Sequence, residues 1–249
     1  MHTQFGVLVI GDEILAGKRQ DKHFTHVIET LRTRGQSVAW YRVASDDHQA
    51  LYESLRQSQQ DCVPVFCFGG IGATPDDNTR QAAARAFGCE LHVHPGALAL
   101  IEAQFGAAAR PNRVRMAELP QGAELIPNPV NRIPGFTLCK HHFFPGFPSM
   151  AWPMLDWVLA RYYPPCEDNA LQERSLRVLG VPESELLQLM ETLVREFPAA
   201  RLFSLPHHGQ PHSVELGFRG EQLVVDAAFD RLVALLRQGQ LSFDIEGAA

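Results

Sequence analysis

The stretch from Phe66 to Arg80, FCFGGIGATPDDNTR, constrains the fold more than any other part of the sequence. An apolar run breaks into Gly69-Gly70-Ile71-Gly72, and an alanine-rich helical pattern follows a few residues later. The pattern predicts a strand, a glycine turn and a helix, which together place backbone N–H groups where a phosphate can bind. Asp76 and Asp77 stand in the same loop, so a phosphate there would need a cation beside it. Because strand-to-helix turns also need glycine for steric reasons alone, the plain structural interpretation stays open.

Apolar runs alternate with helical patterns through the first part of the chain. Strands are predicted over 5–10, 37–43 and 63–68, and a helical pattern follows each of them. The helix after the first strand is predicted over 21–34. This alternation predicts a mainly parallel sheet with helices on both faces. Further on we expect a strand over 90–93, a helix over 95–105, a proline-rich passage with short strands, a strand over 138–144 and a closing helix over 150–162.

The length of 249 residues suits one large domain followed by a small one. We expect the first domain over 1–163, a linker over 164–169, a small α+β domain over 170–241 and a frayed tail over 242–249. In the small domain, strands are predicted over 172–179, 200–205 and 213–218, and helices over 182–197 and 221–237.

Composition excludes several classes of protein. A net charge of −6 argues against a nucleic-acid-binding surface, which usually needs a basic face. No apolar stretch approaches the length of a membrane span, and the N-terminus lacks the pattern of a signal peptide. The five cysteines include no C-x-x-C pair. We therefore expect reduced thiols in a cytoplasmic protein with no membrane partner.

Three acidic pairs stand just after predicted strands: Asp12-Glu13, Asp46-Asp47 and Asp76-Asp77. Because ligands of parallel sheets bind at the carboxyl ends of the strands, these pairs are candidates for one site. Aspartate also caps helices well, so each pair has a capping interpretation of equal weight.

Histidines occur close together at His92 and His94, at His141-His142 and at His207-His208. Clustered histidines bind zinc in some proteins. No third ligand stands at a recognisable spacing, so surface or packing roles are the favoured interpretation.

Several short motifs in fixed order resemble one known family. The glycine loop with its acids, Gly69 to Thr79, is similar to the GGxGPTxDDxT motif of the CinA-type N-terminal domain, within the MoaB/Mog-like molybdopterin-binding superfamily. The resemblance covers about residues 4–160. The other matching segments are 11–15, Gly17, Asp21, Val43, 46–47, Asn112, 115–117, 119–120, 122–123, 126–128, 134–135 and 145–150.

The resemblance implies a three-layer αβα sandwich that binds a phosphorylated pterin or nucleotide. By motif, the two aspartates that act on the ligand in Mog-type relatives correspond to Asp46 and Asp77. In CinA-type relatives this domain is linked to hydrolysis of the pyrophosphate bond of ADP-ribose, with a divalent metal and potassium. The small C-terminal region resembles the KH-like module of CinA proteins, although it contains no basic GxxG loop. Relatives of this fold often self-associate, so a homo-oligomer and a monomer both stay open as alternatives.

The chain departs from the family pattern at several positions. Ala73 stands where the family usually has proline, and His23 stands where asparagine is common. Asn131-Arg132 replace a Gly-Thr pair, and Ile133 replaces a small residue. The rim of the site is therefore expected to admit a different ligand. No region like the amidohydrolase domain of many CinA proteins follows, so deamidation is not expected.

Oxygen ligands from Glu13, Asp46 and Asp77 suit Mg²⁺ or a similar hard ion, which would bridge carboxylates and phosphates. Three functions follow for one site: a binder of a phosphorylated pterin or nucleotide, a metal-dependent nucleotide pyrophosphatase, or a degenerate scaffold. Asp46 and Asp77 are the candidate catalytic residues. The expected ligand-binding residues are Gly11, Gly69, Gly70, Ile71, Gly72, Thr74, Asp76, Thr79, Pro145 and Gly146.

Overall fold

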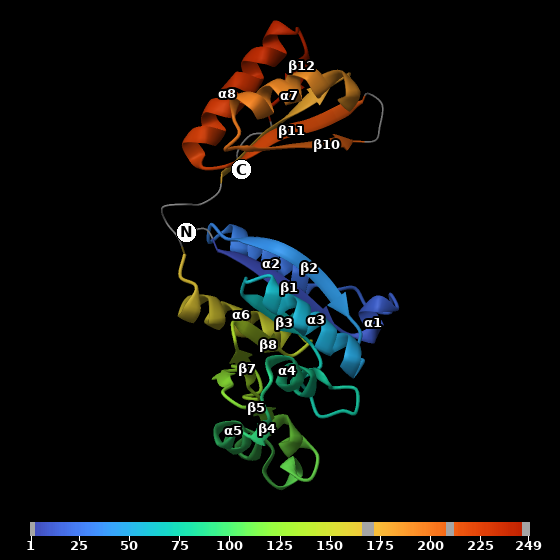
Figure 1. Cartoon of the computed structure of the whole chain (residues 1–249), viewed down its shortest axis with the longest axis vertical. Coiled ribbons are helices and arrows are strands. Elements are labelled where there is room, and N and C mark those ends of the chain that lie inside the picture. The colour runs from blue at the N-terminus through green and yellow to red at the C-terminus, as the bar shows by residue number, and fades with distance from the viewer. Residues whose placement is uncertain (1–2, 166–171, 208–211, 246–249) are drawn as a thin grey trace. The chain divides into compact units, whose positions relative to one another are not determined.

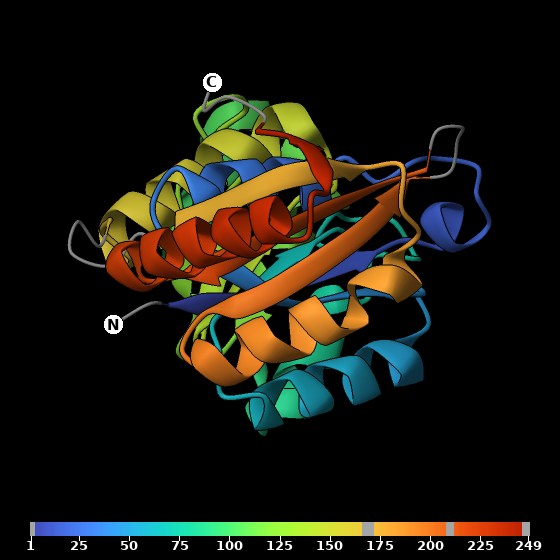
Figure 2. The same ribbon diagram turned by 90° about the horizontal axis from the view of Figure 1, so that it is seen from above.

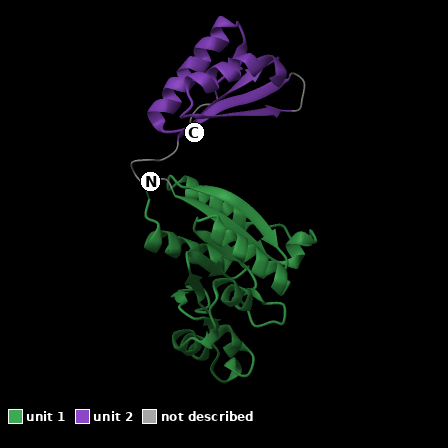
Figure 3. Ribbon diagram, in the orientation of Figure 1, with its two compact units in different colours: residues 1–166 green, residues 167–249 purple. Residues whose placement is uncertain are grey.

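The computed structural model describes residues 3–165, 172–207 and 212–245. The chain divides into two compact units, residues 1–166 and 167–249 (Figure 3). Most of the predicted linker, His208 and the last residues of the predicted tail lie outside the described residues.

The first unit alternates strands and helices, as the apolar periodicity predicts (Figure 1). Its strands are β1 (Gln4–Ile10), β2 (Ser37–Ala44), β3 (Val65–Phe68), β4 (Leu91–Val93), β5 (Glu118–Pro120), β6 (Glu124–Ile126), β7 (Gly135–Leu138) and β8 (His141–Phe144). Its helices are α1 (Asp12–Leu15), α2 (His23–Arg32), α3 (His48–Gln60), α4 (Thr79–Phe87), α5 (Pro95–Phe105) and α6 (Pro148–Tyr162), with 3-10 turns at η1 (Gly106–Ala109) and η2 (Arg113–Ala117).

The main sheet has the strand order β2-β1-β3-β8-β7-β6. Strands β2, β1, β3 and β8 run parallel, whereas β7 is antiparallel to both of its neighbours. The predicted mainly parallel sheet is thus confirmed. The carboxyl ends of β1, β2, β3 and β8 meet at one edge of the sheet, and the loops that follow them build the candidate site.

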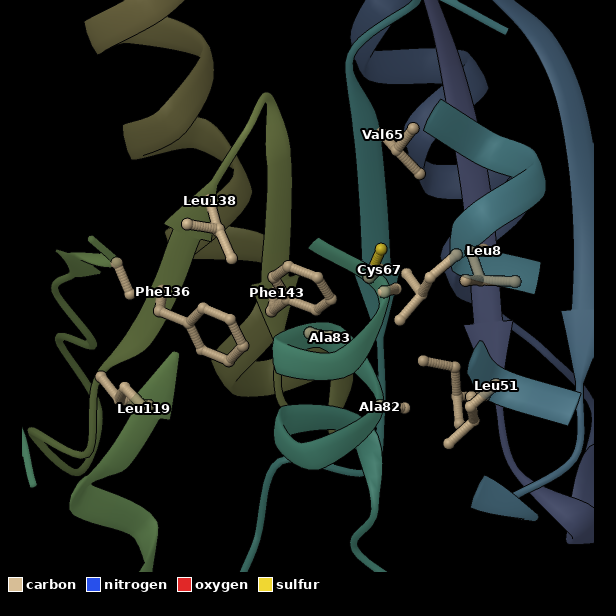
Figure 4. Packing of buried hydrophobic residues seen from close by; sticks show 14 of the residues in the cluster. Leu8, Leu51, Val65, Cys67, Ala82, Ala83, Leu119, Phe136, Leu138 and Phe143 are labelled. Atoms are coloured by element: carbon tan, nitrogen blue, oxygen red, sulfur yellow. The ribbon is translucent and has the colours of Figure 1, made fainter. Parts of the chain in front are cut away.

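Helices cover both faces of this sheet. On one face, Leu8, Val65 and Cys67 of the strands pack against Leu51 of α3 and against the alanines of α4 (Figure 4). The other face holds a separate apolar cluster, in which side chains of α2 and α6 pack on β1, β3 and β8.

The predicted single strand over 138–144 is wrong. The structure has a hairpin instead, in which Cys139 and Lys140 turn the chain between β7 and β8 with φ of 48° and 62°. Positive φ at both central residues is the geometry of a tight two-residue hairpin. Neither residue type announces such a turn, so the continuous apolar run conceals it.

The second unit contains β9 (Gln172–Leu179), the 3-10 turn η4 (Glu183–Leu186), α7 (Leu187–Glu196), β10 (Arg201–His207), β11 (Ser213–Gly220), α8 (Gln222–Gln238) and β12 (Ser242–Asp244). Its sheet is antiparallel, with the order β10-β11-β9-β12. Helices α7 and α8 pack on the same face of it (Figure 2).

The segment predicted as a frayed tail from residue 242 begins with a strand, β12, that pairs with β9. Phe243 packs against the apolar core of this unit, which explains why the segment is ordered although it is too short for a periodic pattern. With β12 included, the order β-α-β-β-α-β is the ferredoxin-like arrangement rather than the expected KH-like outline. Within the described residues, no helix is both long and apolar enough to cross a membrane.

His141 and His142 are packing residues. His142 is 1% exposed, and its ring nitrogens bond the Thr137 hydroxyl at 2.8 Å and the Tyr163 hydroxyl at 2.9 Å. Burial, together with the neighbouring His141, lowers the pKa of His142 to about 3. The folded state therefore holds this imidazole neutral, whereas the unfolded chain protonates it below a pH of about 6.5.

Acid should accordingly destabilise the first unit. Because the pKa of His142 is lower in the folded than in the unfolded state, its contribution to stability is lost as pH falls below the pKa of the unfolded chain. Between pH 7 and pH 5, His142 alone should lower the free energy of unfolding by about 2 kcal/mol. Urea titrations followed by tryptophan fluorescence report this unit, because all three tryptophans lie in it. His142→Gln should show a shallower decline with pH, whereas the exposed His92→Gln control should match the wild type; equal slopes in all three proteins would contradict the argument.

Candidate functional site

A pocket of about 450 Å³ lies at the carboxyl edge of the parallel strands. The loops after β1, β2, β3 and β8 form most of its wall, so strand exits far apart in the sequence meet there. Nearly all of the predicted site residues line it: Gly11, Glu13, Asp46, Gly69, Gly70, Ile71, Gly72, Thr74, Asp76, Asp77, Pro145 and Gly146.

Thr79 is the exception. Its side chain is fully buried and lies behind the glycine loop rather than in the pocket wall. The Thr79 hydroxyl donates to the Gly69 carbonyl at 3.1 Å, and its backbone N–H donates to the Gly70 carbonyl at 3.1 Å. The predicted ligand contact of Thr79 is therefore wrong, because the first turn of α4 uses this residue to hold the loop.

Arg80 holds the same loop from the same side. This side chain is 3% exposed, and its guanidinium donates to the Gly72 carbonyl at 2.6 Å and to the Arg115 carbonyl. Burial lowers the pKa of Arg80. Among the described residues it makes no ion pair, so its positive charge is shared between backbone carbonyls.

These contacts determine where the loop's N–H groups point. In a trans peptide the carbonyl and the following N–H point in opposite directions. Because the carbonyls of Gly69, Gly70 and Gly72 face α4, the N–H groups of Gly70, Ile71 and Ala73 face the opposite side, where these residues line the pocket. None of these three N–H groups donates to a described residue. Successive free N–H groups of this kind form a cradle for an anion.

The substitution Thr79→Val tests whether Thr79 supports ligand binding by holding the glycine loop in place. The isosteric valine removes the hydrogen bond to Gly69 and leaves a buried carbonyl without a partner, which should cost about 1 kcal/mol of stability. The Gly70 N–H would lose its fixed direction, so we expect the affinity for pyrophosphate to fall about tenfold in calorimetric titrations. Thr79→Ser keeps the hydroxyl and should bind like the wild type; equal binding by both variants would contradict this role.

Asp46 lines the pocket from the loop after β2 and is bonded to Asp12, which follows β1. Two hydrogen bonds link Asp46 and Asp12. The Asp12 N–H donates to the Asp46 carboxylate at 2.9 Å, and the Asp46 N–H donates to the Asp12 carboxylate at 3.4 Å. Asn78 donates its side-chain amide to the Asp46 carbonyl at 3.0 Å, which ties the loop after β2 to the start of α4. Burial raises the pKa of Asp46, and the carboxylates of Asp12, Glu13 and Asp76 add to the rise.

The second aspartates of two acidic pairs, Asp47 and Asp77, have different roles. Asp47 caps α3 by accepting from the N–H groups of Gln49 and Ala50, so its role is structural. Asp77 lines the pocket, and its carboxylate accepts from both the N–H and the hydroxyl of Thr74. The Thr74 hydroxyl is therefore engaged with Asp77, and the expected hydroxyl donor to a phosphate is not free.

No preformed metal cage is present among the described residues, where no group of three or more His, Cys, Asp or Glu side chains could hold an ion. Glu13, Asp46 and Asp77 share one pocket without converging on a common point. Mg²⁺ commonly binds to one or two protein carboxylates together with ligand phosphates, so these residues fit an ion that arrives with its ligand.

Part of the wall lies outside the set of predicted ligand-binding residues, although Ala73, Asn131 and Ile133 were expected at the rim. The additional lining residues are Ile10, Arg19, Ala73, Met116, Asn128, Asn131, Ile133, Phe147 and Met150. Asn131 and Ile133 belong to the segment that departs from the family pattern, and both face the pocket, whereas Arg132 does not line it. Of the others, Ala73, Met116, Asn128, Phe147 and Met150 lie in segments that match the family's motifs, whereas Ile10, at the end of β1, and Arg19, after α1, lie outside the matching segments.

The fold and the pocket define an α/β protein with a glycine-loop cavity at the carboxyl edge of a mainly parallel sheet. Residues 6–164 match the family described as "Probable molybdopterin binding domain". The chain therefore belongs to this family, as its motifs indicate.

Relatives agree with this assignment. A CinA-like protein of Citrifermentans bemidjiense is 32% identical over 197 residues, which are 76% of this chain and 48% of that protein. The chain thus spans about half the length of such curated relatives. A Pyrobaculum aerophilum protein is 28% identical over 251 residues and is matched over 93% of both chains. The crystal structure of CinA from Thermoplasma acidophilum, a protein of unknown function, superposes with a TM-score of 0.59 at 27% identity and covers 64% of this chain and 97% of that one.

Proposed function

We propose that this chain binds a phosphorylated pterin or nucleotide, with the phosphate at the glycine loop and a divalent cation between the phosphate and the carboxylates. The single observation that carries this proposal is the set of N–H groups of Gly70, Ile71 and Ala73. They line the pocket without partners because α4 holds the carbonyls before them. An N–H cradle at the start of a helix favours phosphate.

A cation is part of the proposal because of the charges on the pocket wall. Four carboxylates line it, from Glu13, Asp46, Asp76 and Asp77, against one cationic side chain, Arg19. A phosphate brought among them without a cation would be repelled. Glu13, Asp46 and Asp77 are the residues that would hold Mg²⁺ or a similar ion, and potassium remains an expectation of the resemblance. When bound, the ion would neutralise charge and polarise a phosphorus centre.

Hydrolysis of a nucleotide pyrophosphate is the second candidate, and the position of Asp46 favours it. Asp46 lies on the pocket wall provided by the β2 loop, separate from the glycine loop that would hold the phosphate. Burial raises its pKa, and a general base works best when its pKa approaches the working pH. Asp46 would orient the attacking water, and Asp77 would act from the loop side.

One assay separates the candidates. The purified protein is incubated with ADP-ribose, FAD or an adenylylated pterin, with and without Mg²⁺ and potassium, while binding and AMP release are followed in parallel. Metal-dependent binding without turnover supports the binder, and AMP release supports the hydrolase. If nothing binds with metal present, the proposal fails and a scaffold without a ligand remains.

A further inference from the structure

A second pocket, of about 310 Å³, adjoins the first. The two share Ile10, Glu13, Arg19, Gly146 and Phe147 in their walls. None of the residues predicted as catalytic lines the second pocket. A ligand larger than a phosphate could therefore extend from the glycine loop into this space.

The buried residues in the lining of the second pocket carry no charge, and they form its floor. Val9 and Phe68 come from the ends of β1 and β3 and are almost fully buried. His23 is 4% exposed and stacks on Phe68, with the two ring centroids 4.3 Å apart. Its Nε2 lies 3.2 Å from the Gly146 carbonyl, and burial lowers the pKa of His23, which keeps the ring neutral. Such a floor suits an uncharged planar group.

Phe147 stands on the wall between the two pockets. Of the phenylalanines, all of which the structure describes, it alone is largely exposed, at 58%. It precedes α6 and Pro148, and the proline restricts its backbone to the extended region, where it lies with φ of −94° and ψ of 117°. An aromatic ring held in solvent beside a pocket offers a stacking surface for a planar ring.

Cationic side chains edge the second pocket. Arg19 and Lys22 are both exposed, and neither makes an ion pair with a described residue. The carboxylate of Asp21, which stands between them in sequence, is already engaged by the N–H groups of His23 and Phe24 and by the Tyr41 hydroxyl. Arg19 lines both pockets, so it lies where a group linking a phosphate to a ring would pass.

We propose that the second pocket receives a planar nitrogen heterocycle of the ligand whose phosphate binds at the glycine loop. Phe147 stacks on the heterocycle, and Arg19 contacts the linking phosphate. This inference rests on the proposed function and adds the chemistry of the ligand's other end. A purine base and a pterin share this chemistry, and the test distinguishes them.

The test compares ligands with and without the ring. Titrations in the presence of Mg²⁺ measure the affinities of ADP, a pterin diphosphate and pyrophosphate for the wild type, Phe147→Ala and Phe147→Tyr. Loss of one stacked ring should weaken the ring-bearing ligands about tenfold in Phe147→Ala, while pyrophosphate binding changes less than twofold. Phe147→Tyr keeps the ring and should retain the wild-type affinities. Thermal denaturation checks that both variants fold, which the exposure of Phe147 makes the expected result.

The outcomes are distinct. If pyrophosphate fails to bind the wild type, the proposed function itself is wrong. If pyrophosphate binds but neither ring-bearing ligand binds more tightly, or if Phe147→Ala weakens pyrophosphate and ADP equally, the second pocket does not hold a ring. The ligand that loses more affinity in Phe147→Ala identifies the heterocycle as a purine or a pterin.

Discussion

Asp77→Asn is expected to lower metal-dependent AMP release from ADP-ribose by about 100-fold or more. The asparagine oxygen can still accept from Thr74, as the carboxylate does, so the loop should keep its shape while the negative charge is lost. Without that charge, binding of Mg²⁺ together with the phosphate should weaken as well. Initial rates and calorimetric titrations at several Mg²⁺ concentrations measure both effects.

Asp47→Asn is the matched control for this prediction. Asp47 is also the second acid of an adjacent pair after a strand, but its carboxylate caps α3. Asparagine caps helices as well as aspartate does, so stability and ligand binding should both be unchanged. If Asp77→Asn behaves like this control in saturating Mg²⁺, the role given to Asp77 is wrong. If the wild type binds without turnover, the comparison is made on metal-dependent affinity alone.

Gly69→Ala is expected to destabilise the first unit by about 3 kcal/mol and to abolish binding at the loop. Gly69 has φ of +111°, and an added Cβ would lie 2.3 Å from the Ile10 carbonyl oxygen at the end of β1. The two nearest atoms, the carbonyl oxygen and carbonyl carbon of Ile10, belong to the backbone, so they cannot move without disturbing the sheet edge. Urea titrations followed by tryptophan fluorescence, together with pyrophosphate titrations, measure the two losses.

Gly88→Ala is the control for Gly69→Ala, because Gly88 has a positive φ but no close neighbour for an added Cβ. Gly88 ends α4 with φ of +69°, and an added Cβ would meet nothing within 4 Å. We expect a loss of about 1 kcal/mol there and unchanged pyrophosphate binding. Equal destabilisation by the two substitutions would show that the approach of Gly69 to Ile10 has no energetic weight.

Much of the first unit could be predicted from the sequence because its signals are local. The continuous apolar run of β1 and the amphipathic spacing of α2 each specify one element. The glycine loop carries its glycines and acids within a few consecutive residues, and parallel topology brings Asp46 to the same edge. Elements that depend on pairing partners were missed: β12 is ordered by the edge of β9 and by the apolar core beneath Phe243.

The roles of individual side chains in the site were harder to predict, since they depend on direction as well as position. A threonine in a phosphate loop is as compatible with a ligand contact as with a contact to the loop's own backbone. Only the fold shows that Thr79 faces Gly69 and Gly70 and that Arg80 is buried against Gly72. Phe147 lies in the segment 145–150 that matches the family pattern, and Asn131 in a segment that departs from it, but only the fold shows that both line the pocket.

The holding of the glycine loop by Thr79 and Arg80 has a kinetic consequence. A loop whose peptide directions are fixed before a ligand arrives loses little conformational entropy when the ligand binds. Association should then be limited by encounter rather than by folding of the loop, and substitutions behind the loop should mainly shorten the residence time of the bound ligand. The first turn of α4 would thus govern how long a phosphate stays, although neither of its two holding side chains lines the pocket.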